Sequence, residues 1–235
     1  GIIIPYYLYV VYGDTSTVAE HWNSMALYMD TYMASTNGMG GDHSYGDWLA
    51  YESNDDTIKD MLGVSYYAWD AMLMSEMAKA IGLTAEAERY AAIYEDEKAF
   101  YQQYVNTDGT LKRGEQSVCL YALFLDLLPD ENSVAKVTEQ LISNIERNGN
   151  RLQTGFLGTE IIMHTLTKIG RSDVAYKLLL QHENPSWLYS VDQGATTIWE
   201  RWNSYTLAKG FGDVNMNSFN HYSYGSVASW MFRGM

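Results

Sequence analysis

The stretch DTIKDMLGVSYYAWDAMLMSEMAKAIGLTAEAERYAAIYEDEKAFYQQYV, residues 56–105, indicates the class of fold that this chain adopts. Its apolar residues recur at a spacing near 3.6, which is the period of an α-helix. Its first half ends at Gly82, a residue type that often follows a helix C-terminus, and Thr84 is a suitable cap for a second helix. The stretch therefore predicts two helices, over 56–82 and 84–105, joined by a short turn.

The same periodicity predicts eight more helices along the chain. They cover residues 1–11, 17–33, 114–128, 129–149, 159–169, 173–181, 196–207 and 223–233. No alternating apolar run bounded by turn residues predicts a strand, and no fixed repeat supports a regular solenoid. The sequence therefore predicts an all-α protein.

The connections between these helices indicate how they are arranged. Short turns alternate with longer, often Gly-rich loops, so the helices form consecutive hairpins. Hairpins arranged around an axis give a toroid, in which the loops at one end carry function. A ring of six hairpins has twelve helices, so the count for this chain is about two short.

Charge and cysteine content exclude several classes of function. The net charge of −14 argues against binding nucleic acid or an anionic membrane surface, which both require basic residues. The single Cys119 rules out an intrachain disulfide and a multi-cysteine metal site. The sequence has no HExxH, P-loop, GxGxxG or GxSxG motif, so we expect neither a metal nor a cofactor.

The first residues bear on the origin of the chain. The opening GIIIPYYLYVV has neither the basic segment nor the cleavage site of a signal peptide, and it is too short to span a membrane. We interpret the sequence as cut from a longer chain, and it leaves the compartment open.

The aromatic content is unusual, with 20 Tyr and 7 Trp against 6 Phe. Tyr and Trp combine a flat apolar face with a polar tip, which suits the binding of sugars. The alternative is that these residues fill helix interfaces.

The string GATTIWERW, residues 194–202, places a carboxylate among large rings. Glu200 lies between Trp199 and Trp202, and on the predicted helix Arg201 would not face it, because neighbouring residues diverge. Burial by indoles would disfavour the charged form of Glu200 unless hydrogen bonds or a cation restore it. Glu200 is therefore either a functional carboxylate or a helix N-terminal residue that satisfies backbone donors.

A second candidate site lies in GDHSYGDWLAY, residues 41–51. Asp42, Asp47 and Trp48 stand in a loop with nearby glycines, which allow a backbone to approach a ligand closely. The alternative is a turn in which Asp47 caps a helix.

A third candidate lies in MNSFNHYSYG, residues 216–225. Asn217, Asn220 and His221 cluster just before the last predicted helix. A histidine among tyrosines can equally be structural. The other histidines have no spacing that suggests a metal site: His21, His43, His164 and His182.

Taken together, several strings resemble glycoside hydrolase family 78, the bacterial α-L-rhamnosidases. They occur in the order of the family and extend over essentially all of residues 1–235: GDWLA, TGFLGTEIIMHTL, GRSDVAYKLLLQHENPSWLYSVDQGATT, GATTIWERWNS and FNHYSYGSVASWMFR. The resemblance implies an (α/α)6 catalytic barrel and inverting hydrolysis of terminal α-L-rhamnosides.

The resemblance also implies roles for individual residues. The general base of the family lies in TTIWE and falls on Glu200. Its sugar-packing tryptophan in GDWLA falls on Trp48, and its pocket histidine in FNHY falls on His221. Asp47 is a further candidate for substrate binding. An inverting pair of carboxyl groups stands about 6.5–9.5 Å apart, with one activating water and the other protonating the leaving oxygen.

One departure from the family limits this interpretation. The family's general acid lies in an upstream DER stretch, followed by a GWGDA-like segment, and neither is present in this sequence. We therefore expect residues 1–235 to be a partial barrel that lacks the acid and the first one or two helices and has little activity alone. Its expected partners are a rhamnose-containing glycoside or polysaccharide and, at exposed apolar faces, the missing N-terminal part or a second copy.

Two other classes of function remain open from the sequence. The chain can be another glycosidase or a polysaccharide lyase on the same toroid. It can also be a sugar-binding remnant without catalysis.

Overall fold

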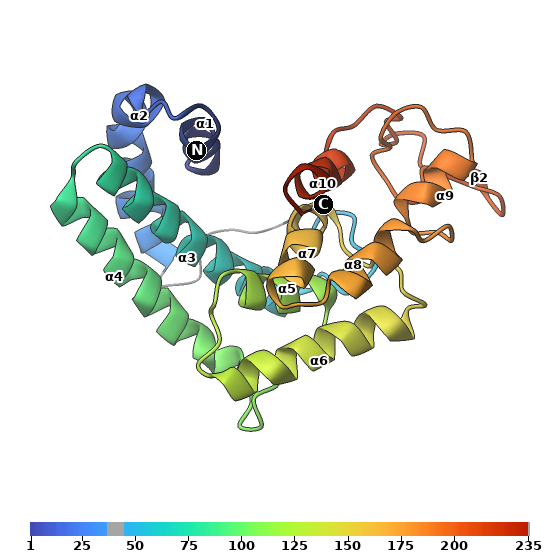
Figure 1. Cartoon of the computed structure of the whole chain (residues 1–235), viewed down its shortest axis with the longest axis horizontal. Helices are drawn as coiled ribbons and strands as arrows, with labels where there is room; N and C mark the ends of the chain where they lie inside the picture. Colours follow the sequence, from blue (N-terminus) through green and yellow to red (C-terminus); the bar gives the residue numbers. More distant parts are fainter. Residues whose placement is uncertain (37–44, 235) are drawn as a thin grey trace.

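The computed structural model describes residues 1–36 and 45–234, and these form an arc of paired helices (Figure 1). The helices are α1 (Ile3–Tyr12), α2 (Ser16–Leu27), α3 (Asp56–Ala80), α4 (Thr84–Tyr101), α5 (Gln116–Phe124), α6 (Glu131–Arg147), α7 (Phe156–Lys168), α8 (Ser172–Leu179), α9 (Trp187–Asp192) and α10 (Val227–Gly234). A π-helical segment, Tyr28–Met33, continues α2, and three short 3-10 segments follow at Ala34–Thr36, Gln102–Tyr104 and Ser223–Ser226. Two short strands, β1 (Tyr205–Thr206) and β2 (Gly210–Phe211), pair antiparallel.

The hairpin of α3 and α4 confirms the first prediction. Asp55 is the N-cap of α3. Its side chain accepts a hydrogen bond from the Ile58 amide at 3.2 Å, which satisfies one of the free donors of the first turn. Of the 25 residues of α3, 16 are buried, so this helix is enclosed on most of its surface. The turn after it uses Gly82 at φ +78°, a conformation that glycine adopts without a steric penalty.

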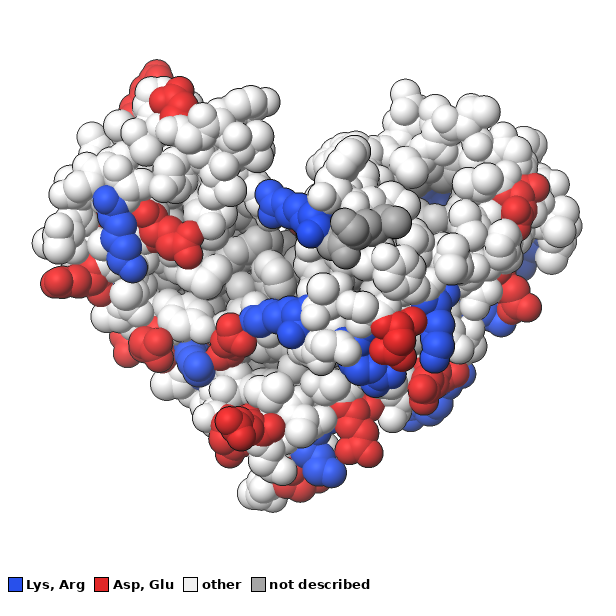
Figure 2. Space-filling view, in the orientation of Figure 1, with Lys and Arg blue, Asp and Glu red and all other residues white. Residues whose placement is uncertain are grey.

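Buried inner helices alternate with amphipathic outer ones. In α5, eight of nine residues are buried, whereas α6 buries mainly one stripe that includes Val137, Leu141 and Ile145. Figure 1 shows the pairs α3/α4, α5/α6 and α7/α8 following one another around a common centre. Figure 2 shows charged side chains gathered over the outer helices, while the walls of the indentation between α1 and α10 are mainly uncharged. The hairpin arrangement expected from the loop pattern is therefore present.

The predicted helix over residues 196–207 is wrong. This segment is extended and irregular, because its backbone bonds to a later part of the chain. The Glu200 amide donates to the Ser218 carbonyl at 2.9 Å, and the His221 amide donates to the Ile198 carbonyl at 2.8 Å. Thr196, Thr197 and Ile198 are β-branched, which favours such an extended conformation over a helix.

Two smaller elements also differ from the sequence prediction. The β1–β2 hairpin adds a short sheet to an otherwise helical protein. The helix α9 was not predicted, and it begins where Ser186 accepts a hydrogen bond from the Tyr189 amide at 3.1 Å. Among the described residues, none of the helices combines the length and apolarity required for a membrane span.

Burial of Asp70 predicts a pH-dependent stability. Asp70 lies on α3 with 8% of its surface exposed, and burial raises its pKa from the usual 3.8 to about 7, while the Gly1 amine acts in the opposite direction. The folded protein therefore holds a proton that the unfolded chain releases, so the free energy of unfolding falls as pH rises from about 4 to about 7. We expect Asp70→Asn to abolish this fall in the free energy of unfolding and to stabilise the protein at pH 8 by up to about 4 kcal/mol.

Thermal unfolding at pH 4.5 and pH 8 measures this effect. The same substitution at the exposed Asp96 on α4 serves as the control, with no expected gain. A gain for Asp70→Asn of equal size at both pH values would contradict a proton-linked cause.

Candidate active site

Four segments that are far apart in the sequence meet around the N-terminus of α7. They contain Trp48, Phe156, Glu200 and His221. The Phe156 amide donates to the Trp48 carbonyl at 3.0 Å, and the rings of Phe156 and His221 stack with centroids 5.0 Å apart. His221 is tied by its backbone to Ile198, two residues before Glu200. The structure thus brings Trp48, His221 and Glu200 into one region through Phe156 and Ile198.

The carboxylate of Glu200 has one defined partner. Its Oε2 accepts a hydrogen bond from the Ser218 amide at 2.7 Å, and the Ser218 carbonyl accepts the Glu200 amide in return. This reciprocal pair of hydrogen bonds joins both the side chain and the backbone of Glu200 to Ser218. The residue is half-buried, and within the described part of the chain no ion pair joins it to Arg201. One carboxylate oxygen is therefore fixed while the other has no protein donor among the described residues.

His221 has a defined donor pattern. Its Nδ1 accepts a hydrogen bond from the Ser223 amide at 3.3 Å. In the neutral imidazole the proton then lies on Nε2, which makes Nε2 a donor. The rings of Phe156 and Tyr222 both stack on the imidazole, with centroids 5.0 and 5.4 Å from its own.

Asp47 and Trp48 are adjacent, yet their surroundings differ. The Trp48 side chain is 37% exposed and lies edge-on to Tyr45, with ring centroids 5.4 Å apart. Asp47 is only 1% exposed, and its carboxylate accepts hydrogen bonds from the Gly155, Leu157 and Gly158 amides and from the Ser117 hydroxyl. Burial raises the pKa of Asp47, and these four hydrogen bonds act against that rise.

Packed aromatic rings support the segment that carries Glu200. The Trp202 indole stacks on Tyr224 with centroids 3.9 Å apart and donates from Nε1 to the Thr154 carbonyl at 3.0 Å. Trp187 lies edge-on to Trp202 and donates to the Tyr224 carbonyl at 2.8 Å. Trp199 packs edge-on against Phe219. These contacts fix the residues on both sides of Glu200.

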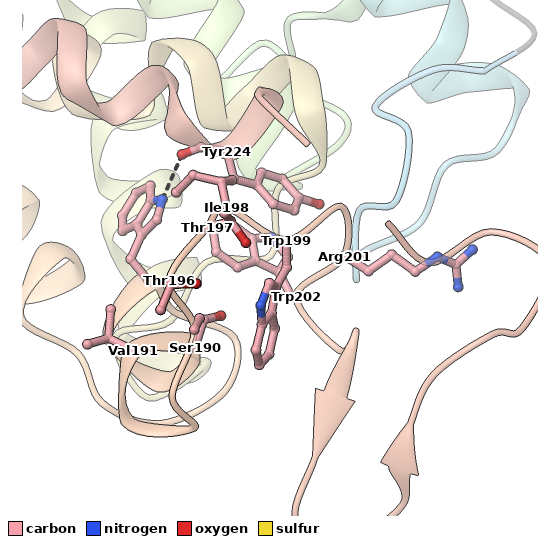
Figure 3. A pocket seen from close by; sticks show the side chains of 11 residues that line it. Ser190, Val191, Thr196, Thr197, Ile198, Trp199, Arg201, Trp202 and Tyr224 are labelled. Atoms are coloured by element: carbon pink, nitrogen blue, oxygen red, sulfur yellow. Dashed lines mark hydrogen bonds between the residues drawn. The ribbon is translucent and has the colours of Figure 1, made fainter. Parts of the chain in front are cut away.

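A cavity of about 270 Å³ opens beside this segment (Figure 3). Its lining is mostly apolar and includes Trp187, Val191, Ile198 and Trp199, while the Arg201 side chain extends away from the other lining groups. Trp199 and Arg201, the two neighbours of Glu200 in the sequence, line the cavity, whereas Glu200 itself does not. Burial raises the pKa of Tyr224, another lining residue.

The other polar candidates have separate surroundings. Asn217 donates to the Ser204 carbonyl at 2.9 Å, and the Asn220 amide donates to the Ser218 hydroxyl at 3.1 Å, so both shape the loop that meets Glu200.

Asp42 and His43 lie outside the described residues. His164 bonds Ser229, and His182 pairs with Asp192 at 2.6 Å. Within residues 1–36 and 45–234, no three His, Cys, Asp or Glu side chains are grouped as metal ligands.

Three residues of the region were not found from the sequence. Phe156 links the Trp48 and His221 segments, Ser218 fixes the Glu200 carboxylate, and Tyr224 stacks on Trp202. Phe156 and Tyr224 lie in the quoted strings TGFLGTE and FNHYSYG, but nothing in their spacing shows which ring they contact.

The whole chain matches one family model. Residues 1–235 match the bacterial α-L-rhamnosidase six-hairpin glycosidase domain. The chain belongs to this family. The six-hairpin domain agrees with the helical hairpins of the fold and with the resemblance drawn from the sequence motifs.

Individual relatives agree with the family assignment. The chain is 37% identical to an α-L-rhamnosidase of Formosa agariphila, over 98% of this chain and 26% of the relative. It superimposes on the crystal structure of the Streptomyces avermitilis α-L-rhamnosidase complexed with L-rhamnose with a TM-score of 0.91 and 37% identity, over 98% of this chain and 22% of that one. The Aspergillus terreus α-L-rhamnosidase gives a TM-score of 0.90 at 30% identity, over 98% and 28%.

These rhamnosidase-family relatives are much longer than the present sequence. The chain spans between 22% and 28% of the length of these three proteins. Membership of the family identifies this chain as a six-hairpin glycosidase domain.

Proposed function

We propose that this chain contributes the general base to a catalytic centre that hydrolyses terminal α-L-rhamnosides with inversion. The observation that carries the proposal is the Glu200 carboxylate, which is held at Oε2 by the Ser218 amide at 2.7 Å in the segment that also anchors His221. A base must be aimed at one water molecule, and a fixed carboxylate with one oxygen free of donors from the described residues is suited to that task.

In the proposed reaction, Glu200 takes a proton from a water molecule as the water oxygen attacks C1 of rhamnose. The bond from C1 to the leaving oxygen breaks on the opposite face, and a general acid protonates that oxygen. Because attack and departure occur on opposite faces, an α-rhamnoside yields β-L-rhamnose first. The acid is not assigned to a residue of this chain, and we predict it to lie in a DER stretch upstream.

Trp48 and His221 form the proposed sugar-binding walls. The partly exposed Trp48 indole offers an apolar face to the C–H groups and the C6 methyl of rhamnose. The Nε2 of His221 donates to a sugar hydroxyl, because its Nδ1 already accepts the Ser223 amide. The relative that binds L-rhamnose in its crystal structure supports this choice of sugar.

A hydrolysis assay tests the proposed function. The complete protein that contains this chain is expected to cleave 4-nitrophenyl α-L-rhamnoside, and proton NMR of the first turnovers is expected to show β-L-rhamnose before mutarotation. The 235-residue chain alone is expected to show little or no turnover.

Three results would contradict this proposal. An unsaturated product that absorbs in the ultraviolet would indicate a lyase, and α-L-rhamnose as the first product would indicate retention. Rhamnose binding without any turnover by the complete protein would instead indicate a sugar-binding role.

A further inference from the structure

Asp47 makes an unusual connection between distant parts of the chain. Its carboxylate receives the Gly155 amide at 2.8 Å on Oδ2 and the Leu157 and Gly158 amides at 2.8 and 3.2 Å on Oδ1. The Ser117 hydroxyl of α5 also donates to Oδ2. We call Asp47 with these four donors the Asp47 clasp. It satisfies the free amides at the start of α7, where Gly155 has no side chain to do so.

The clasp lies directly against the backbone of Trp48. The Trp48 carbonyl accepts the Phe156 amide, which lies between two amides held by Asp47. A Cβ on Gly155 would overlap the Trp48 carbonyl oxygen, so the two backbones meet in a contact that only glycine permits. The position of Trp48 relative to α7 is therefore set by the Asp47 clasp.

The backbone after Trp48 is held in a disfavoured conformation. Leu49 has φ +66°, a left-handed conformation in which a leucine side chain crowds its own backbone. Such a conformation persists only when surrounding contacts enforce it. The hydrogen bond of the Ala50 amide to the Asp47 carbonyl at 3.0 Å and the Asp47 clasp provide these contacts.

We propose that Asp47 is a positioning residue that sets Trp48 and His221 at their working separation, and that it does so without touching the sugar. The inference rests on the proposed function, since it assigns a role within the same site. On one side, the Asp47 clasp adjoins the backbone of Trp48, whose carbonyl accepts the Phe156 amide. On the other side, it holds the start of α7, where the Phe156 ring stacks on His221. With 1% of its surface exposed, Asp47 has no face with which to contact a ligand directly.

Asp47→Asn and Ser117→Ala test the role of the clasp in binding. In Asp47→Asn, the amide oxygen can keep the Leu157 and Gly158 amides, but the amide nitrogen that replaces Oδ2 cannot accept from Gly155, so the contact nearest Trp48 loosens first. We expect KM for 4-nitrophenyl α-L-rhamnoside and Kd for L-rhamnose to rise about 10-fold, with kcat within about 3-fold of the parent, because the support of Glu200 is unchanged. Ser117→Ala removes one donor and is expected to raise both constants by about 3-fold.

Asp130→Asn is the matched control. Asp130 caps α6 by accepting the Ser133 amide at 2.7 Å, and among the described residues its side chain makes no hydrogen bond to the site segments. We expect it to leave KM and Kd unchanged. A purely structural cap at Asp47 would lower the melting temperature while leaving KM unchanged, and that result would overturn the proposal. A fall in kcat at constant KM would also overturn it, because Asp47 would then act in the chemistry.

A second readout separates this inference from the proposed function. In protein labelled with 5-fluorotryptophan, the ¹⁹F signal of Trp48, assigned with Trp48→Phe, is expected to shift in Asp47→Asn and Ser117→Ala but not in Asp130→Asn. If the parent protein neither binds nor cleaves rhamnosides, the proposed function fails while this signal still reports on the clasp. An unshifted Trp48 signal in both clasp variants would refute the positioning role, and Ser117→Ala supplies the measurement if Asp47→Asn does not fold.

Discussion

Glu200→Gln is expected to lower kcat for rhamnoside hydrolysis by roughly 10²- to 10⁴-fold with little change in stability. The glutamine carbonyl can still accept the Ser218 amide, so the reciprocal pair that holds the segment is kept. What is lost is the negative charge that takes a proton from water. Steady-state kinetics of the complete protein, together with its melting temperature, measure both effects.

Glu139→Gln provides the control for this substitution. Glu139 lies on the outer helix α6, is exposed and pairs with Lys136 at 3.3 Å, so its replacement is expected to leave both kcat and stability unchanged. Near-normal activity of the Glu200→Gln protein would remove the assignment of the base.

Trp202→Ala is expected to have the largest effect on stability, lowering the free energy of unfolding by about 3–5 kcal/mol. The indole is 3% exposed, stacks on Tyr224 and lies edge-on to Trp187, so its removal leaves a cavity between these rings. The Thr154 carbonyl would also lose the hydrogen bond from the indole Nε1. Urea unfolding of the parent and variant measures the difference.

Two further variants show whether the stacked ring is responsible. Trp202→Phe keeps a ring against Tyr224 but loses the hydrogen bond, so a smaller loss of about 1–2 kcal/mol is expected. Phe232→Ala, at a side chain that is 90% exposed, is expected to change stability by less than about 0.5 kcal/mol. A loss for Trp202→Ala no larger than for Phe232→Ala would show that the aromatic packing does not support the segment.

Local sequence patterns were sufficient for most of the helices. The α3/α4 hairpin was predictable because the features that define it are local. Its apolar spacing, the turn glycine Gly82 and the start of α4 all lie within residues 56–105. The segment over 196–207 was not, because its backbone partners lie near Ser218 and His221, well beyond any local window. Its apolar spacing resembled a helix, and the tertiary pairing determined the actual conformation.

The candidate site also combines features that the sequence predicts with features that depend on distant contacts. Glu200, Trp48 and His221 were named from family motifs, and the structure brings their segments together, while their catalytic and binding roles remain predictions. The loop pattern allows Asp47 to act as a helix cap, but the helix that it caps begins more than 100 residues later in the chain. No local pattern could have identified that partner, because the contact depends on how the Trp48 loop meets α7.

Azide rescue of Glu200→Ala tests the assignment of the general base most directly. Removal of the carboxylate leaves room for a small anion that needs no deprotonation, so azide can attack C1 where water cannot. With an activated aryl α-L-rhamnoside, we predict that azide restores turnover and that NMR identifies the product as β-L-rhamnosyl azide. An α-configured azide, or the absence of rescue in a variant that remains folded and binds L-rhamnose, would contradict the assignment of Glu200 as the base.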